Sequence, residues 1–311
     1  MKKYIILLLL ISKFGLSQNY TLQDFYIYDA NLAQKTDSIF NTLNDTSRIG
    51  QMIIPAAGRL GKSDEQIKSL IKKQYIGGII LLNGTKTGFI EKISSFDKTN
   101  KGLPLLYSAD AEPSLIGYKI KGSTPVKKAN LMLSRQEVQK YANIICKDLK
   151  EIGINYNYAP VVDMSPNEVI SYRSFGNNSD TAQIWANIFI QETQKNGIVA
   201  TAKHFPGHGY VVGDTHKKLV YIDGEMKEVK NYISLINNGV LSIMVAHIAI
   251  KNNQKLNLSM SYIEAFRKIL TDPLIDKAML CKMLILPAES YLVQLSQEAD
   301  IDAIHQAREF V

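Results

Sequence analysis

Three of the five histidines of this chain lie with three glycines and an aspartate in one stretch, residues 203–216, which reads KHFPGHGYVVGDTH. Asp214 and His216 are two residues apart, so the carboxylate can orient the imidazole and stabilise its charged form. Histidine is the side chain best suited to proton transfer near neutral pH. The spacing therefore predicts an acid/base dyad on a glycine-rich loop that can move.

The same stretch allows two other interpretations. His204 and His208 are four residues apart, a spacing that can bind zinc when both side chains lie on one face of a helix. Pro206 and Gly207 lie between them and interrupt such a helix, so we expect no metal. The second alternative is structural, with turn histidines that are hydrogen-bonded to the backbone.

Short apolar runs recur along the chain at a spacing typical of buried parallel strands. They cover residues 52–54, 78–82, 105–107, 158–162, 198–201, 243–246 and 283–286. Helical patterns lie between them, at residues 63–74, 134–152, 179–196, 225–238 and 261–270. Ser134 with Glu137, and Ser63 with Gln66, have the spacing of a capping box at a helix start.

The alternation of strands and helices predicts an α/β fold built from βαβ units around a parallel sheet. The number and spacing of units favour a (β/α)8 barrel, in which functional residues lie at the carboxyl ends of strands. Residues 203–216 directly follow the predicted strand at 198–201, which agrees with that location. A doubly wound open sheet is the alternative. No glycine-rich nucleotide motif follows a strand, so nucleotide binding has no support.

Composition excludes several classes of protein. The 311 residues are 46% hydrophobic and 21% charged, which is typical of a globular chain. The net charge is +7, but the lysines are scattered, so we expect no nucleic-acid partner. Two cysteines exclude a disulfide scaffold. The composition leaves the oligomeric state open, with a monomer as the simplest case.

The first residues have the pattern of a targeting signal. A basic start precedes an apolar run at residues 4–11 and a polar stretch with small residues, so residues 1–17 are interpreted as a signal peptide. The run is too short to span a membrane. We expect an exported protein, periplasmic or extracellular, with a polar helical lead-in at 18–45 and one barrel domain at 46–311.

The stretch at residues 203–216 resembles the KHFPGHG-x4-D-[ST]-H signature of the β-N-acetylglucosaminidase branch of glycoside hydrolase family 3. The resemblance extends over about residues 49–287. Further matches to the family follow in order, at residues 77–81, 104–110, 153–163, 173–176 (RSFG) and 243–247.

The resemblance implies retaining hydrolysis of terminal β-linked N-acetylglucosamine from chitin- or peptidoglycan-derived saccharides, without metal or organic cofactor. It makes His216 the acid/base, paired with Asp214. It also implies five residues that hold the amino sugar: Asp110, Arg173, Lys203, His204 and, less directly, Asp163.

The chain departs from the family where the nucleophile is expected, at the end of the seventh strand. Only residues 271–282 separate the helix at 261–270 from the run at 283–287, which resembles the eighth strand. In one register residues 269–274 are a remnant of the seventh strand and Asp272 is the nucleophile. In the other register the strand and its nucleophile are deleted. Both leave the barrel incomplete around the seventh strand.

This departure leaves the activity open between several interpretations. The main alternative to hydrolysis is a catalytically impaired relative that binds sugar and has lost its nucleophile. Phosphorolysis is another, because a neutral histidine does not repel phosphate as a carboxylate would. A metal-dependent hydrolase is the last.

Overall fold

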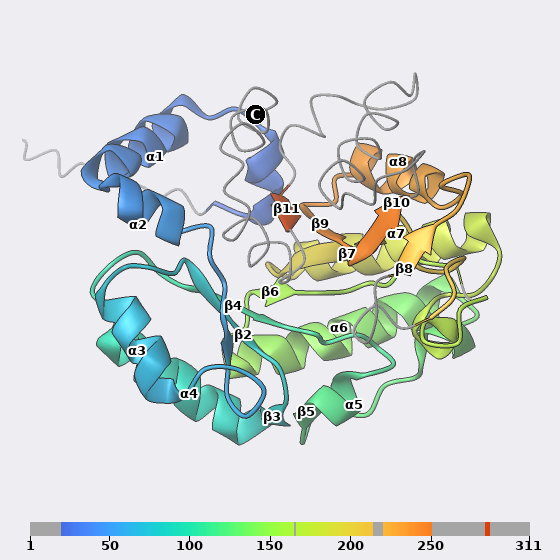
Figure 1. The fold of residues 1–311 in the computed structure, drawn as a ribbon, viewed down its shortest axis with the longest axis horizontal. Helices are drawn as coiled ribbons and strands as arrows, with labels where there is room; N and C mark the ends of the chain where they lie inside the picture. The colour runs from blue at the N-terminus through green and yellow to red at the C-terminus, as the bar shows by residue number, and fades with distance from the viewer. Residues whose placement is uncertain (1–19, 165, 214–219, 251–283, 287–311) are drawn as a thin grey trace, which may run out of the picture.

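A computed structural model describes residues 20–164, 166–213, 220–250 and 284–286 of the chain. Seven strands form one sheet in the order β1-β2-β4-β6-β7-β9-β11 (Figure 1). Every pairing in it is parallel. The strands are β1 (Ala56–Ala57), β2 (Gly78–Leu81), β4 (Leu106–Ala109), β6 (Tyr156–Asn157), β7 (Val199–Phe205), β9 (Ser242–Val245) and β11 (Leu284–Leu286).

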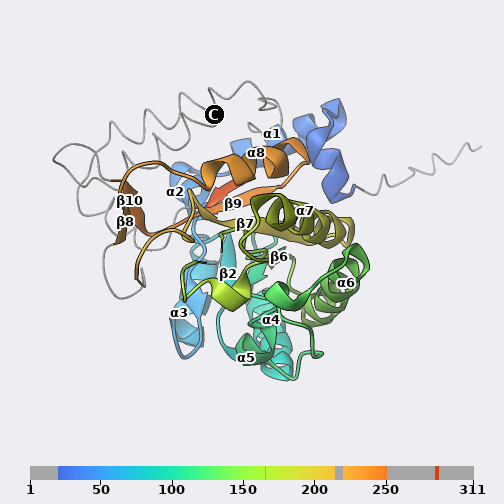
Figure 2. The same ribbon diagram turned by 90° about the vertical axis from the view of Figure 1, so that its right-hand side faces the viewer.

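The helices that connect these strands pack against one another around the sheet. They are α3 (Asp64–Lys72), α4 (Lys86–Thr99), α6 (Arg135–Ile152), α7 (Ser179–Lys195) and α8 (Val229–Asn237). Each contacts the next in this series, and Figure 2 shows them curving around the strands. The predicted α/β class and its βαβ units are therefore confirmed.

The strand order decides between the two predicted architectures. Along the sheet the strands follow one another in the order of the chain, without the reversal that characterises a doubly wound sheet. The doubly wound alternative is therefore wrong, and the arrangement is that of a (β/α) barrel wall. Among the described residues, no pairing joins β11 to β1.

Local sequence explains where two of the helices begin. At α3, the Ser63 hydroxyl accepts a hydrogen bond from the Gln66 backbone, and the Gln66 side chain accepts one from the Ser63 N–H, which confirms the capping box. At α6, the Ser134 hydroxyl accepts from the Glu137 backbone N–H at 3.2 Å. The Glu137 carboxylate turns instead to the backbone N–H of Leu133, so only half of that box forms.

Two predicted strands are displaced. Residues 52–54 form no strand, because turn hydrogen bonds from Met52 and Ile53 continue the end of helix α2 (Asp45–Gly50), and β1 starts later. The strand predicted at 158–162 lies earlier, as β6. Pro160 has no N–H to donate to a ladder, and beyond it only Val161 forms an isolated bridge.

β11 pairs directly with β9, the sixth strand of the series. The sequence assigned residues 283–287 to the eighth strand, but the position beside the sixth is that of the seventh strand in a complete barrel. No described strand lies between β9 and β11. The helix expected at 261–270 and the remnant expected at 269–274 lie outside the described residues.

Smaller elements surround this wall. The segment predicted as a lead-in, residues 18–45, contains η1 (Leu22–Tyr26) and α1 (Ala30–Thr42), and α2 begins at its last residue. Two short parallel pairs join β3 (Gly84–Thr85) to β5 (Ile120–Lys121), and β8 (Val220–Ile222) to β10 (Ile248–Ile250). The connections also contain α5 (Ile116–Lys119), η2 (Ala129–Leu131) and η3 (Ser171–Arg173).

Two further findings concern the described part of the chain only. None of its helices combines the length and apolar character that a membrane span requires. The predicted signal peptide at 1–17 lies outside the described residues, and so does Cys281.

Candidate active site

The carboxyl edge of the sheet brings together the polar residues that follow its strands. Asp110 comes directly after β4, Asp163 follows the bridge at Val161, and Lys203 and His204 lie in the last part of β7. Parallel strands end at the same edge, so residues far apart in the sequence become neighbours. All five predicted sugar-binding residues, including Arg173 from η3, lie in this group or contact it.

A chain of ion pairs links most of these side chains. Lys203 Nζ lies 2.9 Å from Asp110 Oδ1 and 2.6 Å from Glu112 Oε1. Glu112 also accepts two hydrogen bonds from the Arg173 guanidinium, at 2.9 Å from Nε and 2.6 Å from Nη2. Such two-pronged pairs fix orientation as well as charge. Glu112 therefore determines where both cations lie.

Buried amide groups position the segment that carries the two acids. The Asn157 side chain in β6 accepts a hydrogen bond from the Ala111 backbone N–H at 3.0 Å and donates to the Ala111 carbonyl at 3.3 Å. Asn157 is fully buried. Ala111 lies between Asp110 and Glu112, so these bonds hold both carboxylates against the sheet.

A second hydrogen bond ties Arg173 to the same segment. The Ser114 hydroxyl donates to the Tyr172 carbonyl at 2.7 Å and accepts from the Ala129 backbone N–H at 2.9 Å. Three separate parts of the chain are joined in this way. The contact holds η3, and with it Arg173, close to Glu112.

Asp163 orients His204. Its Oδ2 lies 2.6 Å from His204 Nδ1, and its two oxygens also accept the backbone N–H of His204. A third backbone bond comes from His208, at 2.9 Å. Asp163 is fully buried, so its role is to hold His204 and the start of the following loop.

The surroundings of His204, burial above all, favour the neutral form of its ring. Burial lowers the pKa of His204 below its usual value, and the positive charges of Arg173 and Lys203 act in the same direction, against the effect of Asp163. A carboxylate only accepts hydrogen bonds, so Nδ1 carries the proton in this pair. The other ring nitrogen, Nε2, is then an acceptor for a ligand hydroxyl.

The two acids of the ion-pair cluster are held ionised. Burial alone would raise the pKa of Glu112, but the charge of Lys203 and the bonds from Arg173 outweigh it and lower that pKa to about 2. Burial alone would also raise the pKa of Asp110, but the positive charge of Lys203 helps to lower that pKa below its usual value. The cluster thus presents fixed charges at neutral pH.

Exposure divides the site into two layers. The side chains of Asp110, His204 and Arg173 are 21%, 18% and 12% exposed, so they can reach a ligand. Those of Lys203 and Glu112 are only 2% and 1% exposed and lie behind them. Lys203 was expected to hold sugar hydroxyls. In this structure its ammonium group faces Asp110 and Glu112.

Sequence reasoning missed Glu112 and Glu228. Glu112 stands two residues after Asp110 at a strand end, and this Asp-x-Glu spacing was an available signal. Glu228 precedes helix α8 and gave none. Its carboxylate reaches the backbone N–H of Met164, and that of Gly209 at 2.9 Å, through contacts that only the fold creates.

The predicted catalytic residues Asp214, His216 and Asp272 lie outside the described residues. Within the described ranges, no group of three or more His, Cys, Asp or Glu side chains has the arrangement of a metal site. His204 and His208 lie with ring centroids 5.9 Å apart.

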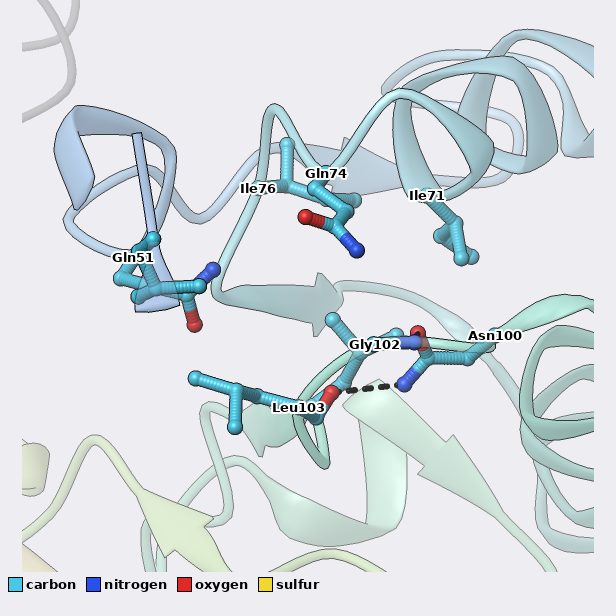
Figure 3. Close-up of a pocket in the computed structure, with 9 residues that line it drawn as sticks. Gln51, Ile71, Gln74, Ile76, Asn100, Gly102 and Leu103 are labelled. Carbon is cyan, nitrogen blue, oxygen red and sulfur yellow. Dashed lines mark hydrogen bonds between the residues drawn. The ribbon is translucent and has the colours of Figure 1, made fainter. Parts of the chain in front are cut away.

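A small cavity lies at the opposite edge of the sheet (Figure 3). Its lining includes Ile76 and Leu105, which precede β2 and β4, so it lies at the amino ends of the strands. The Asn100 side chain there donates to the Leu103 carbonyl at 2.7 Å. In barrels this edge contributes to stability, whereas functional residues lie at the carboxyl edge.

A parallel β/α wall with a charged cluster at its carboxyl edge defines the class, a barrel-type α/β domain. The chain belongs to glycosyl hydrolase family 3, because the model of that family's N terminal domain matches residues 45–278. The resemblance inferred from the sequence is thereby confirmed.

Relatives of known name agree with this family. The chain is 27% identical over 196 residues to a beta-hexosaminidase of Methylobacillus flagellatus, covering 57% of this chain and 56% of that protein. It is 27% identical over 220 residues to the beta-hexosaminidase LpqI of Mycobacterium tuberculosis, covering 67% of this chain and 56% of the relative. The chain thus matches a little over half the length of these two relatives.

Solved structures share the fold. A family 3 beta-N-acetylglucosaminidase from Paenibacillus superposes with a TM-score of 0.64 at 21% identity, covering 85% of this chain and 58% of that one. The beta-glucoside phosphorylase BglX superposes with a TM-score of 0.72 at 19% identity, covering 85% and 50% respectively. At these identities the likeness concerns the fold alone.

Proposed function

We propose that this protein hydrolyses terminal β-linked N-acetylglucosamine with retention of configuration. The observation that carries the proposal is the layered charge cluster at the carboxyl edge, which leads directly into the segment 203–216. The relatives that the chain matches include beta-hexosaminidases. Chitin- or peptidoglycan-derived saccharides are the proposed substrates.

Three partly exposed side chains suit the recognition of a sugar. The Asp110 carboxylate can accept hydrogen bonds from two hydroxyl groups, and the Arg173 guanidinium donates to hydroxyl oxygens. Neutral His204 adds an acceptor at Nε2. Charge-assisted hydrogen bonds are roughly twice as strong as neutral ones, so the first two side chains contribute most.

Retention requires a nucleophile on one face of the sugar and an acid/base on the other. We assign the acid/base to His216, oriented by Asp214, and the nucleophile to Asp272. In the first step His216 gives its proton to the leaving oxygen while the Asp272 carboxylate attacks the anomeric carbon. In the second, His216 takes a proton from the water that releases the sugar.

The test is release of nitrophenol from 4-nitrophenyl N-acetyl-β-glucosaminide, with the anomer of the product identified by NMR. The β-anomer is expected first. His216→Ala should lose most of this activity, and azide, which needs no base, should restore turnover as the glycosyl azide. Full activity in that variant would refute the assignment of the dyad.

Other outcomes select the alternatives. Binding of N-acetylglucosamine without turnover would identify an impaired sugar-binding relative. A rate that rises with added phosphate would indicate phosphorolysis, and loss of activity in chelator would indicate a metal. We also propose that the protein is exported, on the basis of the predicted signal peptide at 1–17, and secretion of a tagged full chain by a bacterial host would test this.

A further inference from the structure

Glu228 is a buried carboxylate that lies outside the ion-pair cluster. It is 3% exposed and sits directly before α8. One of its oxygens accepts the backbone N–H of Met164, and the other accepts that of Gly209 at 2.9 Å. It therefore joins the segment after Asp163 to the loop that follows β7.

The loop is shaped around this carboxylate. A side chain at Gly207 or Gly209 would collide with Glu228, and at Gly209 also with the Met164 carbonyl. Gly207 has a φ of 133°, a conformation that other residues rarely adopt. The glycines of the segment 203–216 thus allow the backbone to approach Glu228 closely.

Asn167 holds the same loop further along. Its side chain donates to the carbonyl of Val211 at 2.7 Å, and lies 3.4 Å from that of Gly213. The side-chain oxygen Oδ1 of Asn167 accepts the Val169 backbone N–H at 2.8 Å, which fixes the orientation of the amide group. Asn167 is 7% exposed.

We propose that Glu228, together with Asn167, is a positioning residue that fixes the loop 207–213 and thereby the starting point of the acid/base segment at 214–216. The inference rests on the proposed function, since it assigns the acid/base to His216. Gly213 is the residue immediately before Asp214, so a shift of the loop moves the dyad relative to the sugar. Tyr210 and Val212 are 49% and 88% exposed, whereas Val211 is 6% exposed and belongs to a small apolar cluster, so the loop is held by one buried side chain together with the hydrogen bonds of Glu228 and Asn167.

The electrostatics of Glu228 agree with a functional placement. Burial, followed by the negative charge of Asp163, raises the pKa of Glu228 to about 8, although backbone N–H groups act against this. Keeping a carboxyl group in such surroundings is unfavourable. The hydrogen bonds that Glu228 accepts from the backbone of Met164 and Gly209 offset this cost.

The decisive variant is Glu228→Gln, which keeps the volume and one acceptor. Its NH2 group only donates, so one of the two backbone N–H groups loses its acceptor, whereas both oxygens of the carboxyl group keep acceptor capacity even when it is protonated. Glu225→Gln is the matched control, because Glu225 is exposed on the same connection. Glu228 and Asn167 are called the loop clamp below. Asn167→Asp is the second variant of this clamp, in which the donor to the Val211 carbonyl is removed.

Leaving-group dependence separates positioning from a merely structural role. The sugar leaving group of N,N'-diacetylchitobiose must be protonated by the general acid. The dinitrophenolate of a 2,4-dinitrophenyl glycoside leaves without that proton. General acid catalysis contributes about 10² to 10⁴ in rate, so partial misplacement should lower kcat/KM for chitobiose by about tenfold or more. For the dinitrophenyl substrate the expected loss is below about threefold. Equal losses on both substrates, or none on either, would overturn the proposal.

Amide hydrogen exchange gives a readout that does not depend on activity. Glu228→Gln should speed exchange of the peptide containing residues 207–213 and leave helix α6 unchanged. If the wild-type chain has no activity, the proposed function fails by itself, and exchange still tests the clamp. Unchanged protection in both Glu228→Gln and Asn167→Asp would then refute it.

Discussion

Glu112 and Arg173 form a two-pronged ion pair in which Nε lies 2.9 Å from Oε2 and Nη2 lies 2.6 Å from Oε1. The same carboxylate contacts Lys203, so one buried acid holds two cations that come from separate parts of the chain. The orientation of Arg173, which we propose to bind the sugar, therefore depends on a residue whose side chain is only 1% exposed.

Removal of the Glu112 charge should destabilise the protein strongly. In Glu112→Gln two buried cations lose their shared anion, and breaking a buried pair costs about 3–5 kcal/mol. Glu151→Gln is the control, because the Glu151 side chain is 57% exposed in its pair with Lys86. Exposed pairs contribute about 0–1 kcal/mol. Urea unfolding at pH 7 measures both, and equal effects would contradict the buried role.

The same carboxyl group should contribute to the pH dependence of stability. Its pKa in the fold is about 2, against an ordinary value of 4.5. A lowered pKa gives stability that is fully present above pH 4.5 and is lost as the pH falls towards 2. The stability difference between wild type and Glu112→Gln should therefore shrink below pH 4.5. A difference that stays constant between pH 7 and 3 would argue against an ionised Glu112.

Asp110→Asn should weaken sugar recognition with little change in fold. A hydrogen bond to a charged group contributes about 1.5–3 kcal/mol, so kcat/KM should fall roughly 10- to 150-fold. Asp180→Asn, at an exposed position in α7, is the control and should stay near wild type. Calorimetric binding of N-acetylglucosamine reports the same loss if turnover is absent. Wild-type affinity in Asp110→Asn would remove Asp110 from the site.

The nucleophile can be identified by comparing two acids. Asp272→Asn should reduce kcat by a factor on the order of 10³ or more if Asp272 attacks the sugar. Glu289→Gln is the informative companion, because Glu289 is the first acidic residue of the chain after β11, which pairs with the sixth strand. Loss of activity in Glu289→Gln alone would reject Asp272. Mass spectrometry of the protein with a 2-fluoro substrate would identify the labelled residue.

Sequence alone determined the features that depend on local chemistry. Ser63 and Ser134 gave the starts of α3 and α6, because capping involves residues only three positions apart. The buried runs gave most strands, since a strand covered on both faces must be apolar. Residues 203–216 and their resemblance gave the family, and the match to residues 45–278 confirms it.

Tertiary structure decided what depends on distant parts of the chain. That Glu112 lies behind Arg173 and pairs with Lys203, and that Glu228 reaches Gly209, follows from strand and helix packing that no spacing encodes. The sequence likewise assigned residues 283–287 to the eighth strand, whereas β11 pairs with the sixth strand, β9. A short apolar run does not specify the strand with which it pairs. Residue types and their spacing are visible in the sequence, whereas the partners of buried charges come from distant parts of the chain. The fold therefore determined which residues of this site face a ligand and which hold the others in place.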